Sequence, residues 1–327
     1  MKMFLFIVLL LIAVSLSMMR LATFWIGNRV EVLYPPEGEF AEVDGVRMHY
    51  TDHPAGDDAD LPPLVFIHGA SGNLRDLEAP MLERLEGRAR LIFVDRPGHG
   101  YSQGWTAAQK HTHLPDGQAD LIAGLLEKIG ISEAVIIGHS YGGAVAAAFA
   151  VEHPDKTAGV VFLAPATHPW PGADVTWYYD VAMLPVIGPL FVRFLAIPAG
   201  WMIYEDAVRG VFKPNRLPAD YPEKSGSRLV LRVQSFTKNA LDVSSLYDFV
   251  SNYHKRYREI TAPVSIITGD SDDVVLAGVH SEGLKQDIAN SRIVWLKNTG
   301  HIPAWIHPET VVAEIERVSQ SAVVSAR

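Results

Sequence analysis

The chain of 327 residues contains no cysteine. This absence excludes a disulfide scaffold, a thiolate metal site and a cysteine nucleophile. Basic residues are also in the minority, since 28 Lys and Arg stand against 37 Asp and Glu, for a formal charge of -9. A surface with that balance repels polyphosphate, so we expect no nucleic-acid partner. Apolar residues make up 48% of the chain and charged residues 20%, which is typical of a globular protein. The length predicts one large domain plus a smaller part.

Charge is missing from residues 3–19, an apolar run flanked by Lys2 and Arg20. A helix over this run would be about 25 Å long, and its continuation to Ile26 would suffice to cross a bilayer. We therefore predict a membrane anchor over residues 1–26 and a linker over residues 27–38. Two alternatives stay open: a cleaved signal peptide, with small residues at Ser15 and Ser17, and a buried helix. Positive residues flank the run on both sides, so they define no orientation in the membrane.

Short apolar runs alternate with segments of helical spacing along the rest of the chain. Such alternation predicts an α/β protein whose parallel sheet is covered by helices on both faces. Asp44-Gly45 between two alternating runs predicts a hairpin. The expected strands are residues 40–43, 46–50, 64–67, 90–94, 134–137, 160–163, 264–268 and 293–296, and the expected helices are residues 116–129, 144–151 and 309–318.

The alternation stops over residues 167–241, which are rich in proline and tryptophan and show no strand pattern. We interpret this stretch as a mostly helical insertion between two strands of a core formed by residues 39–166 and 242–327. Its aromatic residues are expected to fill the insertion's own core, and a lid over a pocket would let them line a ligand site as well.

The sequence Gly138-His139-Ser140-Tyr141-Gly142 matches the G-x-S-x-G pattern. It lies between a predicted strand and a predicted helix, which is the setting of a nucleophile elbow. In that turn the serine adopts a strained backbone conformation that exposes its hydroxyl, and the flanking glycines avoid a clash. We therefore predict that Ser140 is a nucleophile.

A serine hydroxyl needs a base, which in this arrangement follows the acid in the chain. His301 follows the last predicted strand and is the expected base, with His307 as its competitor. The acid is expected on the loop after residues 264–268, where Asp270, Asp272 and Asp273 compete.

An oxyanion requires preorganised donors. The amide of Tyr141 is one candidate, because it directly follows the nucleophile at a helix N-terminus. The amide of Ala70 is the other, because it lies in the glycine-containing loop after residues 64–67.

At this point the chain resembles the α/β-hydrolase superfamily. The resemblance implies an eight-stranded, mostly parallel sheet flanked by helices, with residues 167–241 as a helical cap. It favours Asp272 as the acid and makes His99 a loop organiser. Related dehalogenases and epoxide hydrolases carry aspartate where this chain has Ser140, so their chemistries are not expected. The motifs that carry the resemblance are His68-Gly69-Ala70-Ser71-Gly72, Asp95-Arg96-Pro97-Gly98-His99-Gly100, Gly138-His139-Ser140-Tyr141-Gly142-Gly143, Gly269-Asp270-Ser271-Asp272 and Gly300-His301.

Together these features predict a serine hydrolase that acts on carboxylic esters with an apolar acyl or alkyl group. Cleavage of carbon–carbon bonds or lactones by the same residues is the alternative, although His139 stands where carbon–carbon hydrolases usually have asparagine. A ligand-binding protein without activity is a further alternative. No cofactor is expected, because the chain has no dinucleotide fingerprint and no P-loop. No metal site is expected, because His111 and His113 lack a third ligand at suitable spacing.

Overall fold

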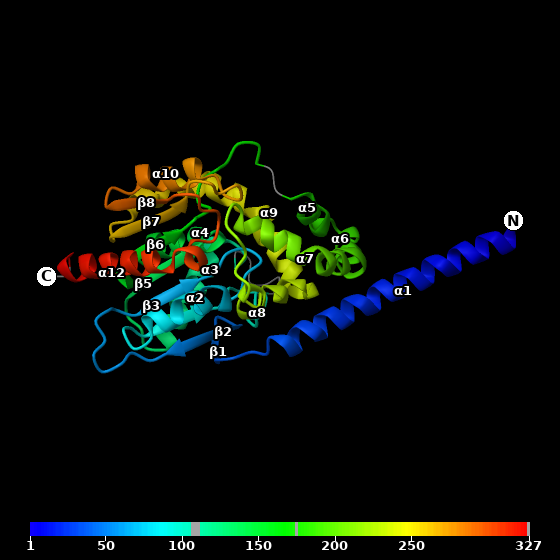
Figure 1. Cartoon of the computed structure of the whole chain (residues 1–327), viewed down its shortest axis with the longest axis horizontal. Coiled ribbons are helices and arrows are strands. Elements are labelled where there is room, and N and C mark those ends of the chain that lie inside the picture. Colours follow the sequence, from blue (N-terminus) through cyan, green and yellow to red (C-terminus); the bar gives the residue numbers. More distant parts are fainter. Residues whose placement is uncertain (106–111, 174–175, 326–327) are drawn as a thin grey trace.

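The computed structural model of the protein describes residues 1–105, 112–173 and 176–325, so His111 lies outside the described part (Figure 1). These residues form one eight-stranded sheet in the order β1-β2-β4-β3-β5-β6-β7-β8. β1 and β2 join at Asp44-Gly45 and are antiparallel to each other, β2 is antiparallel to β4, and the other neighbours are parallel. The predicted fold class is thus confirmed. The strands are β1 (Glu39–Val43), β2 (Val46–His53), β3 (Leu64–Ile67), β4 (Leu91–Val94), β5 (Ala134–His139), β6 (Thr157–Leu163), β7 (Val264–Gly269) and β8 (Ser291–Leu296).

Both faces of the central strands are buried. In β3, Val65 and Ile67 belong to the core on one face, whereas Leu64 and Phe66 belong to the core on the other. Burial on both faces explains why the sequences of the central strands are continuous apolar runs and do not alternate between apolar and polar residues.

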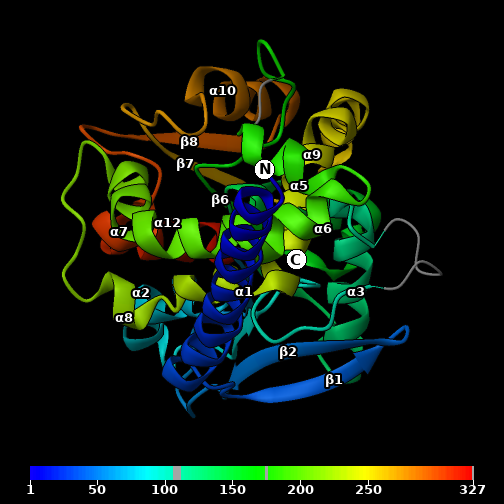
Figure 2. The same ribbon diagram turned by 90° about the vertical axis from the view of Figure 1, so that its right-hand side faces the viewer.

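Helices cover each face, as Figure 2 shows for α2 and α3 on opposite sides. α3 (Pro115–Lys128), α4 (Tyr141–Glu152) and α10 (Ala277–Asp287) pack on one face, and α2 (Arg75–Leu85), α11 (Pro303–Ile306) and α12 (Pro308–Ser325) pack on the other. Our sequence analysis assigned neither α2, which contains Pro80, nor α10.

A mostly helical segment connects β6 to β7. The predicted boundary at residue 241 falls inside α9, which continues to Tyr253. The division of the chain into a cap and a core stays a prediction. The elements of the insertion are α5 (Trp177–Met183), α6 (Ile187–Phe191), η2 (Val192–Ala196), α7 (Ile197–Phe212), α8 (Tyr221–Lys224), η3 (Ser227–Leu231), α9 (Val233–Tyr253) and η4 (His254–Glu259).

The chain begins with one long helix, α1 (Lys2–Leu33). It includes residues 27–33, which we expected to be part of a linker. Its C-terminal third packs on the insertion and buries Thr23, Ile26 and Val30, while its N-terminal part projects away from the molecule (Figure 1). By length and composition, α1 could cross a membrane or serve as a signal sequence. The stretch Ile187–Phe212 in the insertion passes the same test of length and composition.

Candidate active site

Ser140 stands at a sharp turn between β5 and α4. Its φ of 53° and ψ of -118° are unfavourable for a residue with a side chain. The turn is closed by two glycines, since a Cβ atom at Gly138 would lie 2.3 Å from the Gly142 carbonyl oxygen, and one at Gly142 would lie 2.3 Å from that of Ile67. The Ser140 amide donates to the carbonyl of Leu163 in the neighbouring strand at 2.9 Å. The strained conformation is therefore held by the packing of the surrounding backbone.

Ser140 lines a cavity of about 870 Å³ between the sheet and the insertion. His301, Ala70 and Tyr141 line the same cavity. Most of the remaining wall is apolar or aromatic and comes from the insertion, including Trp170, Trp177, Tyr178, Tyr179, Phe191, Leu195, Ile203, Val208, Val211, Leu231 and Phe236. The cavity is thus polar around Ser140 and apolar toward the insertion.

His301 and Asp272 form a buried pair beside this cavity. The His301 Nδ1 atom lies 2.8 Å from Asp272 Oδ2. Asp272 Oδ1 accepts hydrogen bonds from the amides of Val274 and Val275 at 2.8 and 2.9 Å. Burial acts to raise the pKa of Asp272, but His301 and these amides outweigh it and lower the pKa below its usual value. The carboxylate is therefore ionised where histidine titrates, and it fixes the orientation of the imidazole.

The competing residues lie elsewhere. Asp270 and Asp273 are exposed, and Asp270 accepts a hydrogen bond from the Ser271 hydroxyl. His307 pairs with the hydroxyl of Thr299 at 2.8 Å. Among the aspartates of this loop, Asp272 is the one that contacts His301.

His139, the residue directly before Ser140, contacts the main chain of His301. Its Nε2 atom lies 2.9 Å from the main-chain carbonyl oxygen of His301. Burial and the neighbouring His301 lower the pKa of His139 to about 3, so its imidazole is neutral and can donate this hydrogen bond. No hydrogen bond joins the Ser140 hydroxyl to His301 within the described residues. Such contacts are often long in the absence of substrate.

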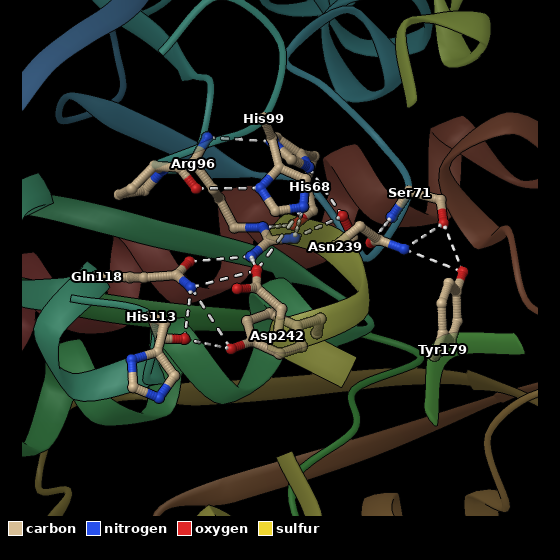
Figure 3. A network of polar contacts seen from close by, with 12 residues as sticks. His68, Ser71, Arg96, His99, His113, Gln118, Tyr179, Asn239 and Asp242 are labelled. Carbon is tan, nitrogen blue, oxygen red and sulfur yellow. Dashed lines mark hydrogen bonds and ion pairs between the residues drawn. The ribbon is translucent and has the colours of Figure 1, made fainter. Parts of the chain in front are cut away.

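The main chain around Ala70 is held by two side chains, which are shown in Figure 3. The Arg96 guanidinium donates to the carbonyls of His68 and Gly69 at 3.1 and 3.2 Å. The Asn239 carbonyl oxygen accepts from the amide of Ser71 at 2.6 Å. The residues on both sides of Ala70 are therefore fixed, which restricts the direction of its amide.

Arg96 is itself part of a buried network that joins the sheet to α9 (Figure 3). Its guanidinium forms an ion pair with Asp242 at 2.6 Å, and neither side chain is exposed. Burial raises the pKa of Asp242 to about 6 although Arg96 and Gln118 act against the shift. The guanidinium also lies 4.3 Å from the centre of the Tyr141 ring. One arginine thus contacts both segments that we expected to supply oxyanion donors.

The sequence analysis did not identify Arg96, Asn239 or Asp242 as part of the site. Arg96 belongs to the motif Asp95-Arg96-Pro97-Gly98-His99-Gly100, in which the sequence predicted a role for His99 alone. That histidine, His99, is buried, and its Nε2 atom lies 3.2 Å from the Arg96 guanidinium. Asn239 and Asp242 are three residues apart on one helix, a spacing that by itself is no sign of a polar network.

Asp76 is a further polar residue that was not predicted from the sequence, and it lies in the cavity wall. It lies in the first turn of α2, where an acid normally faces solvent, yet it is 5% exposed. Its Oδ1 atom has no hydrogen-bond partner in the described structure. Burial raises the pKa of Asp76 to about 6, against the opposing effects of Tyr221, Trp305 and His301.

The fold and the family model agree on the class of protein. Residues 62–308 match the model of the alpha/beta hydrolase fold family, so the chain belongs to that family. This confirms the resemblance found in the sequence.

Individual relatives differ in activity and in extent. A diacylglycerol lipase of Mus musculus, described as sn-1-specific, is 25% identical over 77% of this chain and 78% of its own length. The dihydrolipoyllysine-residue acetyltransferase component of the acetoin cleaving system of Cupriavidus necator is 34% identical, but over 39% of this chain and 32% of its own length. This chain therefore spans about a third of that protein.

Similarity to solved structures extends to α1. A membrane phospholipase A, described as a bacterial virulence factor, superposes with a TM-score of 0.66 at 22% identity and covers 98% of this chain and 99% of its own. At this identity the likeness shows the fold alone. A meta-cleavage product hydrolase and an enol-lactonase share the fold as well.

Proposed function

We propose that the protein is a serine hydrolase that cleaves carboxylic esters with an apolar acyl or alkyl group. The observation that carries the proposal is the strained Ser140 in the wall of an 870 Å³ cavity that also contains His301, itself 2.8 Å from Asp272. A strained serine in a cavity with a buried histidine–carboxylate pair is the arrangement that activates a hydroxyl for acyl transfer.

In this mechanism the Ser140 oxygen attacks the ester carbonyl and His301 takes its proton. The amides of Ala70 and Tyr141 stabilise the tetrahedral oxyanion. His301 then gives the proton to the leaving alcohol as the carbon–oxygen bond breaks, which leaves an acyl-enzyme. Water, deprotonated by the same histidine, releases the acid and restores the serine. Asp272 holds the imidazole and stabilises its protonated form.

The apolar wall supports a substrate with a long or branched hydrocarbon part. One relative is described as an sn-1-specific diacylglycerol lipase, and a diacylglycerol is a carboxylic ester. The polar groups around Ser140 and Asp76 suit the ester group and a polar alcohol.

We further propose that α1 is retained as a membrane anchor. Every residue from Lys2 to Ile7 and from Leu9 to Met18 is exposed, and the run carries no charge between Lys2 and Arg20. A helix that is apolar all round and unpacked is stable in lipid and not in water. Intact-mass analysis of the mature protein tests this: Met1–Ile26 should be retained, and a start near Met18 would show a cleaved signal peptide instead.

A carbon–carbon bond hydrolase or a lactonase is the second candidate, because proteins with these activities share the fold. His139 argues against carbon–carbon cleavage, since carbon–carbon hydrolases usually have asparagine at the position directly before the serine. Turnover of p-nitrophenyl esters of graded acyl length, compared with a vinylogous diketone and a lactone, separates the three activities.

Covalent labelling tests the nucleophile directly. A fluorophosphonate probe should label the wild-type protein and not Ser140→Ala, and kcat should fall by about 10⁴-fold or more in the variant. Ser251→Ala on α9 is the matched control, because its hydroxyl bonds only to the Tyr247 carbonyl away from the cavity. Full labelling of Ser140→Ala would refute the assignment.

A further inference from the structure

The insertion exposes an unusual number of large apolar side chains beside α1. The tip patch consists of Trp177, Leu184, Val186, Ile187, Leu190, Leu195, Met202 and Ile203, all more than 40% exposed. Met202 is 84% exposed and Val186 is 77% exposed. Between Leu184 and Tyr204 the chain carries one charged residue, Arg193. Monomeric soluble proteins rarely leave a contiguous patch of this kind in water.

The tip patch is continuous with α1. The Thr23 hydroxyl donates to the carbonyl of Arg193 at 2.7 Å. The rings of Trp25 and Trp201 meet edge to face with centres 5.7 Å apart. Figure 1 and Figure 2 show α1 projecting from the same end of the molecule that carries α5, α6 and α7. The tip patch thus lies beside the point at which α1 stops contacting the insertion and its apolar N-terminal half begins to project.

This level corresponds to a membrane–water interface if α1 spans a bilayer. Trp and Tyr are favoured at that depth, and Trp25 and Trp201 occupy it together. Arg20 and Arg193 are exposed nearby and can reach lipid phosphates. One exposed acid, Asp180, lies between Trp177 and Leu184, and the exposed acids Glu205 and Asp206 follow the patch, where the surface becomes polar.

The cavity reaches the surface within the tip patch. Trp177, Leu195 and Ile203 line the cavity and are also at least half exposed. Ala199 and Ala207, on α7, likewise line it and are exposed. An apolar path therefore leads from the patch into the cavity that Ser140 lines.

We propose that the tip patch docks into the lipid bilayer and that the hydrocarbon part of the substrate enters the cavity directly from the membrane. This inference rests on the proposed ester hydrolysis for its substrate and on the membrane anchor for its geometry. The occupant of the patch is lipid, because the patch continues the lipid-compatible surface of α1 and two exposed arginines, Arg20 and Arg193, lie where the patch meets that helix.

The absence of cysteine makes the docking measurable in the full-length chain. Met202→Cys, labelled with an environment-sensitive fluorophore, is reconstituted in vesicles of phosphatidylcholine and phosphatidylglycerol. Trp295→Cys is the matched control, because Trp295 is exposed and apolar but lies on β8, away from α1 and from α5, α6 and α7, which carry the tip patch (Figure 1). The label at 202 should shift to shorter wavelength and be quenched by spin-labelled lipid, whereas the label at 295 should do neither.

Two outcomes would overturn the proposal. In one, the label at 202 is as accessible to water as the label at 295. In the other, it is shielded but insensitive to the lipid quencher, and the unlabelled Met202→Cys protein forms a disulfide-linked dimer on addition of an oxidant, which would mean that a second copy covers the patch.

An activity measurement tests the substrate route. The double variant Leu190→Glu and Met202→Glu alters the patch outside the cavity wall. It should hydrolyse a short soluble ester such as p-nitrophenyl acetate at the wild-type rate, and a long-chain ester in the same vesicles about tenfold or more slowly. Trp295→Glu should change neither rate. Equal rates on the vesicle substrate for all three proteins would refute uptake from the membrane. If the wild type fails to cleave the soluble ester, the proposed function fails, and the fluorescence experiment still decides on docking.

Discussion

Asp76 offers a quantitative test of how the cavity treats a buried charge. Its carboxyl has an ordinary pKa of 3.8, which burial raises to about 6 in the folded protein. The folded state therefore binds more protons than the unfolded state between these two values, and stability falls as the pH rises through them. The difference between these two pKa values corresponds to about 3 kcal/mol of destabilisation above pH 6, decreasing to about 0.6 kcal/mol at pH 4.

Asp76→Asn removes the charge and keeps the shape. We expect the free energy of unfolding of the variant to exceed that of wild type by about 3 kcal/mol at pH 8. At pH 4 the difference should be much smaller, because the Asp76 carboxyl is then protonated in the folded protein. Denaturant unfolding of the full chain in detergent micelles at pH 4, 6 and 8 measures the difference, and other titrating groups cancel in the comparison. Asp58→Asn, in an exposed loop, is the control and should show no pH-dependent difference. A stability difference for Asp76→Asn that does not vary with pH would refute the reasoning, and would mean that water in the cavity solvates the carboxylate.

Three further predictions follow from the contacts of the site. Asp272→Asn should lower kcat by about 10³–10⁴-fold, as expected for loss of the group that fixes the tautomer, whereas Asp270→Asn should leave kcat near the wild-type value; a crippled Asp270→Asn would contradict the assignment. Asn239→Ala should lower kcat by about tenfold to a hundredfold with little change in KM for a soluble ester, because the loop that carries the expected oxyanion donor loses its anchor; an effect on KM alone would show a binding role instead. Asp242→Ala should destabilise the fold by about 3–5 kcal/mol in denaturant unfolding, because it leaves the Arg96 guanidinium buried without its partner, and an unchanged midpoint would argue against the ion pair.

Local patterns were sufficient for the sheet and for the position of Ser140. The strands next to the elbow are buried on both faces, so their sequence had to be apolar throughout, and glycines had to stand at 138 and 142 because their neighbours leave no room for a Cβ atom. Because these requirements act within a few residues, they can be recognised in the sequence. The ends of helices were harder to predict from the sequence. α1 continues through residues expected to be a linker, because Ile26 and Val30 are buried against the insertion.

Long-range packing determined the features that the sequence did not reveal. Asp76 occupies a position typical of an exposed helix cap, and its burial depends on α8 and α11, which bring Tyr221 and Trp305 against it. Asn239 reaches the amide of Ser71 from 168 positions along the chain. No local pattern encodes such a contact, because neither residue type is specific to that role.

The sequence by itself determined the family, the strained serine and the apolar N-terminal run, because each depends on backbone sterics or on hydrophobic patterning over a short window. Only the tertiary structure decided which aspartate of the 270–273 loop contacts His301, which side chains hold the main chain at Ala70, and that the exposed apolar residues of the insertion lie beside α1. These arrangements depend on how separate segments pack together, from 29 positions apart for Asp272 and His301 to 168 for Ser71 and Asn239, and the same residues in another packing would carry none of these contacts.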